Sequence, residues 1–173
     1  IYIKIKRNSL KKILLMSDTH GHLDQKMINN VKWADEVWNA GDIGESREVK
    51  ELSKLKPIRA VFGNIDNHLL RSQFEENLVF YCEGVKVLIT HIGGPPGKYN
   101  SRVKKLLLDE KPQLYISGHS HILKVISDKK LNNLIRNDPT FYNVDSFDID
   151  LFRGFLSRLG MTPDSFKEYL KSK

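Results

Sequence analysis

Five short segments of the sequence have the pattern of buried β-strands, and each is followed closely by a side chain that can bind a metal ion. The segments are Lys12–Ser17, Glu36–Asn39, Pro57–Phe62, Val85–Thr90 and Leu114–Ser117. Short apolar runs bounded by glycine or polar residues are typical of strands buried in an α/β fold. Because ligands in such folds gather beyond the carboxyl ends of the strands, residues distant in the sequence are expected to converge there.

Helical periodicity and one turn signal complete the predicted architecture. The segments Arg47–Lys54 and Ser101–Glu110 place apolar residues at helical spacing among charged ones. Glu83-Gly84 is predicted to close an antiparallel hairpin between Asn77–Cys82 and Val85–Thr90. Alternating strands and helices with one hairpin predict an α/β domain, with two layered sheets and helices outside.

The C-terminal part of the chain has weaker signals. Leu123–Ser127 and Asn132–Arg136 are interpreted as paired strands, Phe152–Leu159 as an amphipathic helix, and Thr162–Leu170 as a last helix. The 173 residues suit one domain, so residues 1–173 are expected to form a single unit. Residues 138–173 are interpreted as an extension packed on its core.

Composition excludes several classes of protein. The chain is 40% apolar and 28% charged, and it lacks the run of about 20 apolar residues that a membrane span needs. The first twelve residues lack the features of a secretory signal, so a cytoplasmic location without membrane contact is expected. Cys82 is the only cysteine, which excludes an intramolecular disulfide and a thiolate metal cluster built by one chain. The net charge of +7 would attract phosphorylated ligands, but the lysines are scattered.

Seven side chains that suit metal binding follow the predicted strands: Asp18, His20, Asp42, Asn64, His91, His119 and His121. In Asp18-Thr19-His20 and in His119-Ser120-His121, alternate side chains of an extended chain point the same way, while the middle residue points elsewhere. Gly41, Gly63 and Gly118 each precede a proposed ligand, where the chain must turn sharply or let backbone approach closely.

Oxygen and imidazole ligands suit Mn, Fe, Zn, Ni or Co, and four histidines make Mg and Ca less suitable. Two ions with four protein ligands each would have to share one carboxylate, which is assigned to Asp42. One ion would take Asp18, His20, Asp42 and His121, and the other Asp42, Asn64, His91 and His119. Two carboxylates and two divalent ions leave a charge of +2, which can hold a hydroxide and an anionic phosphoryl group.

The string Asp18-x-His20, Gly41-Asp42, Gly63-Asn64-x-Asp66, His91 and Gly118-His119-x-His121 resembles the calcineurin-like metallophosphoesterase superfamily, in particular its small cap-free bacterial and archaeal phosphodiesterase branch. The resemblance extends from Lys12 to about Ile135. It implies a four-layered α/β/β/α sandwich with two mixed β-sheets. It also implies a dinuclear metal centre, with manganese as the first choice, whose activated hydroxide hydrolyses a small phosphate ester. The catalytic residues implied are Asn64, Asp66 and His91, with Asn64 orienting the phosphate.

Two departures from the family pattern affect these expectations. Many larger members have a histidine where this chain has Ile65, and that histidine is thought to protonate the leaving alkoxide. Ile65 cannot donate a proton, so good leaving groups should be preferred. Asp66, His68 and His22 are candidates for support or proton transfer, with His22 and His68 more simply explained as surface or supporting histidines. Asn137-Asp138-Pro139-Thr140 is a distorted version of the family's Asn-Pro-Gly-Ser turn.

Two other functions share this fold. The small retromer subunit is similar in fold, but its metal site is degraded, whereas none of the seven ligands is missing here. A nuclease would need a basic tract or an aromatic–basic platform, which this sequence lacks. The expected partner is therefore a small phosphoester substrate, with no nucleic acid, and a homo-oligomer is compatible with the sequence.

Overall fold

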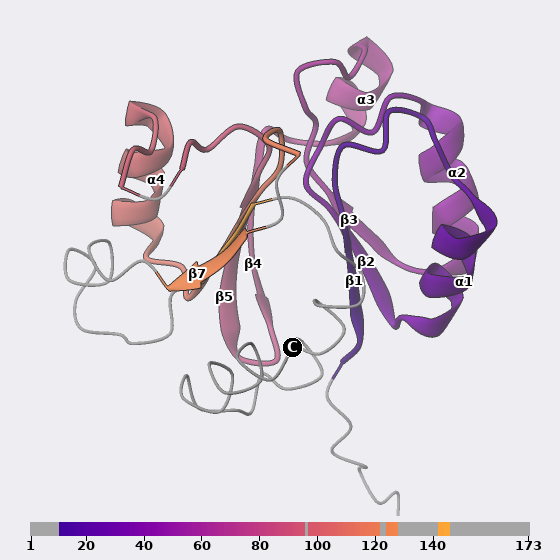
Figure 1. Cartoon of the computed structure of the whole chain (residues 1–173), viewed down its shortest axis with the longest axis horizontal. Coiled ribbons are helices and arrows are strands. Elements are labelled where there is room, and N and C mark those ends of the chain that lie inside the picture. The colour runs from indigo at the N-terminus through magenta and orange to yellow at the C-terminus, as the bar shows by residue number, and fades with distance from the viewer. Residues whose placement is uncertain (1–10, 96, 122–123, 128–141, 146–173) are drawn as a thin grey trace, which may run out of the picture.

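Two β-sheets lie face to face in the computed structural model, with helices on the outer side of each (Figure 1). The structure describes residues 11–95, 97–121, 124–127 and 142–145. The first part of the chain forms β1 (Ile13–Met16), α1 (Gln25–Trp33), β2 (Glu36–Asn39), α2 (Ser46–Leu55), β3 (Ile58–Ala60) and α3 (His68–Gln73). The second part forms β4 (Asn77–Cys82), β5 (Val85–Thr90), α4 (Ser101–Glu110), β6 (Leu114–Ser117), β7 (Lys124–Ser127) and β8 (Tyr142–Asp145).

The first sheet has the strand order β1-β2-β3, and its described strands are all parallel. Parallel neighbours need a crossover, which α1 supplies between β1 and β2 and α2 supplies between β2 and β3. All four residues of β1 and of β2 are buried, as expected for strands covered on both faces. The carboxyl ends of the three strands therefore share one edge.

The second sheet is mixed, with the order β4-β5-β6-β8-β7. Strands β5, β6 and β8 are parallel, while β4 and β7 run antiparallel to their neighbours. The hairpin turn between β4 and β5 is Glu83-Gly84, as the sequence predicts. One sheet is thus mixed as expected, whereas the other is parallel because each of its connections is helical.

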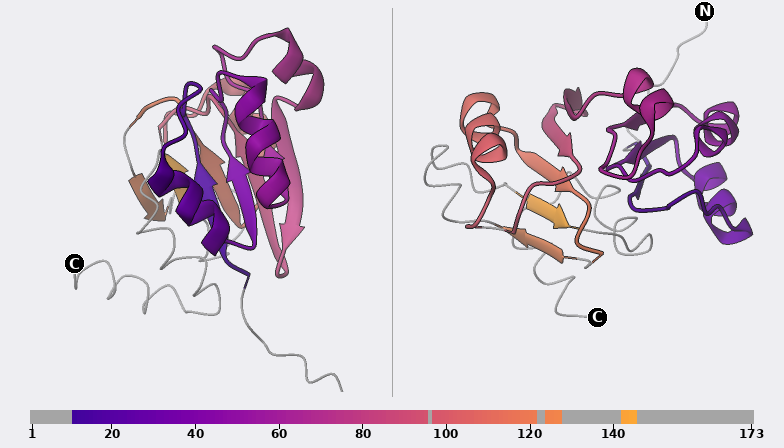
Figure 2. Two further views of the ribbon diagram at one scale, coloured as in Figure 1. Left: turned by 90° about the vertical axis from the view of Figure 1, so that its right-hand side faces the viewer. Right: turned by 90° about the horizontal axis from the view of Figure 1, so that it is seen from above.

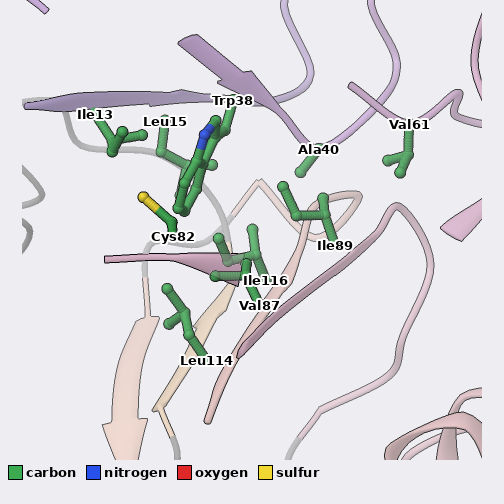
Figure 3. Close-up of a cluster of buried hydrophobic side chains, with 10 residues drawn as sticks. All are labelled: Ile13, Leu15, Trp38, Ala40, Val61, Cys82, Val87, Ile89, Leu114 and Ile116. Atoms are coloured by element: carbon green, nitrogen blue, oxygen red, sulfur yellow. The ribbon is translucent and has the colours of Figure 1, made fainter. Parts of the chain in front are cut away.

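Apolar side chains fill three interfaces between four layers. The two sheets pack together through Ile13, Leu15 and Trp38 on one side and residues such as Val87, Ile89 and Ile116 on the other (Figure 3). Alternate residues of β1, Leu14 and Met16, face α1 and α2 instead. Helix α4 covers the outer face of the second sheet through Val103 and Leu107. Viewed from above, α4 and the pair α1 and α2 lie on opposite outer sides (Figure 2). The predicted α/β/β/α sandwich is confirmed.

Most predicted elements agree with the structure, and α1, α3 and β8 were not predicted. Helix α1 begins after Asp24, whose side chain accepts a hydrogen bond from the Met27 N–H. The predicted strand Leu123–Ser127 contains β7, which pairs with β8, and its pairing with Asn132–Arg136 stays a prediction. The segments Asn132–Arg136, Asn137–Thr140, Phe152–Leu159 and Thr162–Leu170 lie outside the described residues, as does nearly all of 138–173.

Cys82 lies in the core between the two sheets, with 8% of its surface exposed. Burial raises the pKa of its thiol, which disfavours the reactive thiolate. Its interpretation as a small buried apolar residue agrees with this position. Within the described ranges, no helix combines the length and apolar character that a bilayer span requires.

Replacing Glu83 by asparagine is expected to stabilise the protein. Glu83 and Gly84 have φ of 50° and 83°, the left-handed pair of a type I′ hairpin turn. Asparagine tolerates this conformation better than glutamate, so Glu83→Asn should raise the free energy of unfolding by about 0.5–1 kcal/mol in urea denaturation. Glu83→Ala removes the same charge, but alanine does not favour the left-handed conformation, so this variant should not raise the free energy of unfolding. Equal gains in both variants would attribute the effect to charge and contradict the backbone explanation.

Candidate metal centre

The seven side chains singled out from the sequence meet at one edge of the sandwich. Asp18 and His20 follow β1, Asp42 follows β2, and Asn64 follows β3. The second sheet contributes His91 after β5, and His119 with His121 after β6. The convergence follows from the topology, because these five strands end at the edge that the two sheets share.

Six of the seven form two clusters that could each hold a metal ion. One consists of Asp18, His20 and His121, and the other of Asp42, His91 and His119, each with its ligating atoms within 4.8 Å of one another. We call them the first and the second cluster. Each contains residues from both sheets, so neither sheet alone could complete either cluster.

Asp42 lies between the two clusters. Its Oδ2 is 4.0 Å from the His20 Nε2 of the first cluster, and its Oδ1 is 3.2 Å from the His91 Nε2 of the second. The carboxylate is nearly fully buried, which fixes both oxygens in these directions. A carboxylate placed in this way can supply one oxygen to each of two ions.

Asn64 joins the second cluster through its side chain. Its Oδ1 lies 3.0 Å from the His91 Nε2, and the residue is exposed to solvent. An amide oxygen is a suitable ligand for a divalent cation, and the exposed position leaves the amide accessible to a substrate.

The orientation of His91 provides a test of whether these residues fit a metal ion. Its Nδ1 is 2.8 Å from the Ala40 carbonyl oxygen, which can only accept, so Nδ1 carries a proton. In the neutral ring the Nε2 lone pair then points at oxygens of Asp42 and Asn64. Several lone pairs facing one another require a cation or a second ring proton between them. The donor set therefore fits a metal ion, and the Ala40 carbonyl is the kind of partner that orients metal-binding histidines.

Asp18 is held in place from three directions. The Ser17 hydroxyl donates to its Oδ2 at 2.6 Å, and the His119 backbone N–H lies 3.0 Å from the same oxygen. Its Oδ1 is 3.4 Å from the His121 Nε2. The second of these contacts links the ends of β1 and β6, so the position of the first cluster depends on how the sheets pack.

The backbone at Asp18, His20, His119 and His121 is left-handed and not extended as expected, and His119 and His121 belong to different clusters. Among the described residues other than glycine, seven have positive φ, and five of these are candidate ligands: Asp18, His20, Asp42, His119 and His121. A left-handed conformation at a residue with a side chain costs on the order of 1 kcal/mol. Such conformations concentrate at functional sites, where the surrounding fold maintains them.

Two of the glycines that precede ligands are needed because other groups approach them closely. A Cβ at Gly63 would lie 2.0 Å from the Asp42 Oδ1, and a Cβ at Gly118 would lie 2.0 Å from the Ser17 Oγ. Any side chain would displace Asp42 or the Ser17–Asp18 pair. The expectation of close approach thus holds at both positions.

Asp66, singled out as catalytic, is nearly fully buried and accepts backbone hydrogen bonds with both carboxylate oxygens. Its Oδ1 accepts from the Gly44 N–H at 2.8 Å and its Oδ2 from the Gly63 N–H at 2.7 Å. This geometry suits a positioning role, since it ties the loop that carries Asn64 to the loop after β2. His22 and His68 are exposed and belong to neither cluster.

Glu48 is a buried acid in contact with the segment that carries Asp18 and His20, and the sequence reasoning missed it. The Thr19 hydroxyl, between the candidate ligands Asp18 and His20, donates to its Oε1 at 2.7 Å. Thr19 thus points away from the clusters, as expected. Burial raises the pKa of Glu48 to about 7; the Thr19 hydrogen bond opposes the rise and the charge of Asp66 adds to it. Its Oε2 is buried without a hydrogen-bond partner in the described part of the chain.

Ser17, the Ala40 carbonyl and the Ile65 N–H also support the centre, and sequence reasoning missed all three. The Ile65 N–H donates to the Asp42 Oδ1 at 3.0 Å, so Ile65 contributes through its backbone. Only Ser17 could have been recognised in the sequence, because it lies beside Asp18. The two backbone contacts leave no trace in the sequence, because any residue type can make them.

A family model described as the calcineurin-like phosphoesterase superfamily domain matches residues 12–143. The match spans well over half of the chain, and the chain therefore belongs to the calcineurin-like phosphoesterase superfamily. This confirms the resemblance seen in the sequence. A second model, a SurA-like N-terminal domain, matches residues 116–173, which is less than half of the chain and overlaps the first match. None of the curated proteins compared with the chain matches it.

Several solved structures share the fold. A Thermotoga maritima protein solved by NMR is 24% identical, with 82% of this chain and 87% of that chain covered and a TM-score of 0.62. Vps29 from Entamoeba histolytica, in complex with Zn²⁺, is 15% identical, covering 77% and 72%, with a TM-score of 0.57. A Streptococcus pneumoniae protein described as a predicted phosphoesterase is 19% identical, covering 78% and 71%, with a TM-score of 0.53. At these identities the likeness shows the fold.

Replacing Glu48 by glutamine is expected to change how stability depends on pH. A raised pKa means that the folded protein keeps a proton that the unfolded chain loses above about 4.5, so stability falls as the pH rises from 4.5 to about 7. Glutamine cannot ionise. At pH 8 in the absence of metal, Glu48→Gln should therefore be more stable than the wild type by on the order of 3 kcal/mol.

The difference between the two proteins should shrink to near zero at pH 4, as measured by urea denaturation across the pH range. Glu51 is an exposed residue on the same helix, and the Glu51→Gln variant should show the same dependence of stability on pH as the wild type. A constant difference between Glu48→Gln and the wild type from pH 4 to 8 would contradict the raised pKa.

Proposed function

We propose that this protein is a metal-dependent phosphoesterase, and in particular a phosphodiesterase that hydrolyses a small phosphate ester. The observation that best supports it is the pair of adjacent metal-binding clusters, with Asp42 between them. Membership of the calcineurin-like phosphoesterase superfamily supports the same reaction class. The likeness to a Streptococcus pneumoniae protein described as a predicted phosphoesterase agrees with it.

The proposed centre holds two divalent ions that share Asp42. Asp18, His20, Asp42 and His121 would bind one ion, and Asp42, Asn64, His91 and His119 the other. Manganese is the first choice, with nickel, iron, zinc and cobalt as alternatives, because the set consists of oxygen and imidazole ligands. The Zn²⁺ in the similar Vps29 structure is consistent with a divalent ion in this fold.

When bound, the ions supply positive charge to the phosphoryl oxygens and make a water molecule acidic enough to attack phosphorus. The chain's own residues position the reactants. His91 is held by Ala40 and Asp42 by the Ile65 N–H, so neither needs to reorganise. Asn64 and His91 line a cavity open to solvent and are the residues proposed to face the substrate. Asp66 is proposed to keep the Asn64 loop in place.

Divalent metal should both stabilise the protein and switch on hydrolysis. Metal-stripped protein is titrated with Mn²⁺ or Ni²⁺ while bound metal, melting temperature and cleavage of bis(p-nitrophenyl) phosphate are followed. We expect two ions per chain and turnover that depends on them. Asp42→Asn should lower kcat/KM by roughly 100-fold or more and reduce the bound metal, because it removes the shared charge.

Asp109→Asn, an exposed exchange on α4, serves as the control and should behave like the wild type. If two ions bind but neither phosphodiesters nor phosphomonoesters are hydrolysed, the proposed phosphoesterase activity is contradicted. That result would favour the second candidate, a protein-binding scaffold, to which the likeness to Vps29 also lends support.

The rate should depend steeply on the leaving group. The Ile65 side chain is 46% exposed beside Asn64 and carries no proton to donate. In a series of aryl methyl phosphodiesters, esters of weakly acidic phenols should be cleaved far more slowly than nitrophenyl esters. Ile65→His should accelerate the poor substrates by roughly 10²-fold, the lower range for general acid catalysis, and change the good ones little.

Ile65→Gln is the matched control, since it is polar and similar in size but is not an acid. An equal gain from Gln and His would show that proton donation is not what the site lacks. A shallow leaving-group dependence in the wild type would mean that another group already protonates the leaving oxygen.

A further inference from the structure

A cavity of about 280 Å³ lies beside the second cluster. Asn64 and His91 form part of its wall, so a ligand that contacts these residues can extend into it. Two arginines, Arg71 of α3 and Arg102 of α4, also line it. The cavity therefore places two cations next to the site where the proposed reaction would occur.

No carboxylate among the described residues forms an ion pair with Arg71. Its Nε donates to the Asp66 carbonyl oxygen at 2.7 Å, and its Nη2 donates to the carbonyl oxygens of Gly63 and Asn64, both at 3.0 Å. Its guanidinium lies over the Phe62 ring, 4.7 Å from the centroid. Within the described ranges, Arg71 forms no ion pair and its Nη1 makes no hydrogen bond. These contacts hold the guanidinium rigidly while leaving donors for a ligand.

Arg102 also lines this cavity. Its Nη1 donates to the Asn77 Oδ1 at 2.6 Å, and its Nη2 is 3.3 Å from the Glu76 Oε1 in a half-exposed ion pair. Glu76 also lines the cavity, so its negative charge balances one of the two arginines. One positive charge remains in excess on the cavity wall.

The rest of the wall includes apolar surface. Phe62 and Ile92 line the cavity, and Ile92 is 39% exposed. Apolar walls with a few convergent polar groups are typical of small-molecule sites. A guanidinium group that is held in place is well suited to donate a charge-assisted hydrogen bond to a carboxylate or phosphate oxygen.

We propose that this cavity binds a second anionic group of the substrate, and that Arg71, assisted by Arg102, selects phosphoesters carrying a carboxylate or a phosphate beyond the scissile phosphate. The inference rests on the proposed function, because it treats Asn64 and His91 as the place where the scissile phosphate lies. An apolar spacer between the two anionic groups would lie against Phe62 and Ile92. Arg71 is thus a specificity-determining residue.

The test measures binding by calorimetry to the Mn²⁺-loaded full chain. The probes are 3-phosphonopropionate and 3-methylbutylphosphonate, which differ by the exchange of a carboxylate for an isopropyl group of similar shape. Ethylene-1,2-diphosphonate is the third probe and distinguishes a phosphate from a carboxylate as the second group. The measurements are repeated with probes that have longer methylene spacers, because the distance from the phosphonate to Arg71 determines which spacer allows the second group to reach it.

The readout is the ratio of affinities for charged and uncharged probes. In the wild type the charged probe should bind roughly tenfold tighter or more, the amount expected for a charge-assisted hydrogen bond. Arg71→Gln should bring this ratio close to one, Arg71→Lys should restore part of it, and Arg102→Gln should lower it. Arg47→Gln is the control, since Arg47 is exposed on α2 and pairs with Glu51.

A purely structural role of Arg71 would weaken both probes and leave their ratio unchanged, which would overturn the inference. An equal affinity of the wild type for charged and uncharged probes at every spacer length would overturn it too, while leaving the proposed phosphoesterase intact. If no phosphonate binds in a metal-dependent way, both the inference and the proposed function fail.

Discussion

The face-to-face packing of the two sheets is the constraint on which the rest of the structure depends. The first sheet supplies Asp18, His20 and Asp42, and the second supplies His91, His119 and His121. The clusters divide these residues differently, because each takes members from both sheets. The bond from His91 to the Ala40 carbonyl and the bond from the His119 N–H to Asp18 join the sheets directly at the centre. The buried apolar layer between the sheets, which includes Trp38 and Ile89, therefore determines the distances between candidate ligands.

The same packing explains how the chain maintains unfavourable local structure at the site. Left-handed backbone at five candidate ligands opposes folding, and so does a buried acid such as Glu48. Both features concentrate at one edge of the sandwich, whereas the strands below it are regular and fully buried. The apolar layers thus stabilise the fold. The residues at this edge destabilise it, but they adopt a geometry that suits metal binding. Proteins commonly deviate from local rules at functional sites in this way.

The sequence predicted those parts of the structure whose signals are local. The hairpin around Glu83-Gly84 and helix α4 agree with prediction to the residue, since turn chemistry and apolar spacing define them. Helix α1 was missed because Asn29 and Asn30 weaken its helical signal, and its packing on β1 compensates. The candidate ligands could be found because each follows a strand. Glu48 and Arg71 could not be found, because the contacts that distinguish them exist only in the tertiary structure.

The contact between Asp18 and His119 joins residues that are 101 positions apart in the chain. Closing so long a loop is entropically costly and occurs only when other contacts have already shortened it. We therefore expect the two clusters to form at a late stage of folding, after both sheets have formed and docked. A metal ion present during synthesis would find only fragments of its site on the nascent chain. The proposed metal ions would then bind after folding and would not nucleate it, unlike the ions of small zinc domains that fold around their metal.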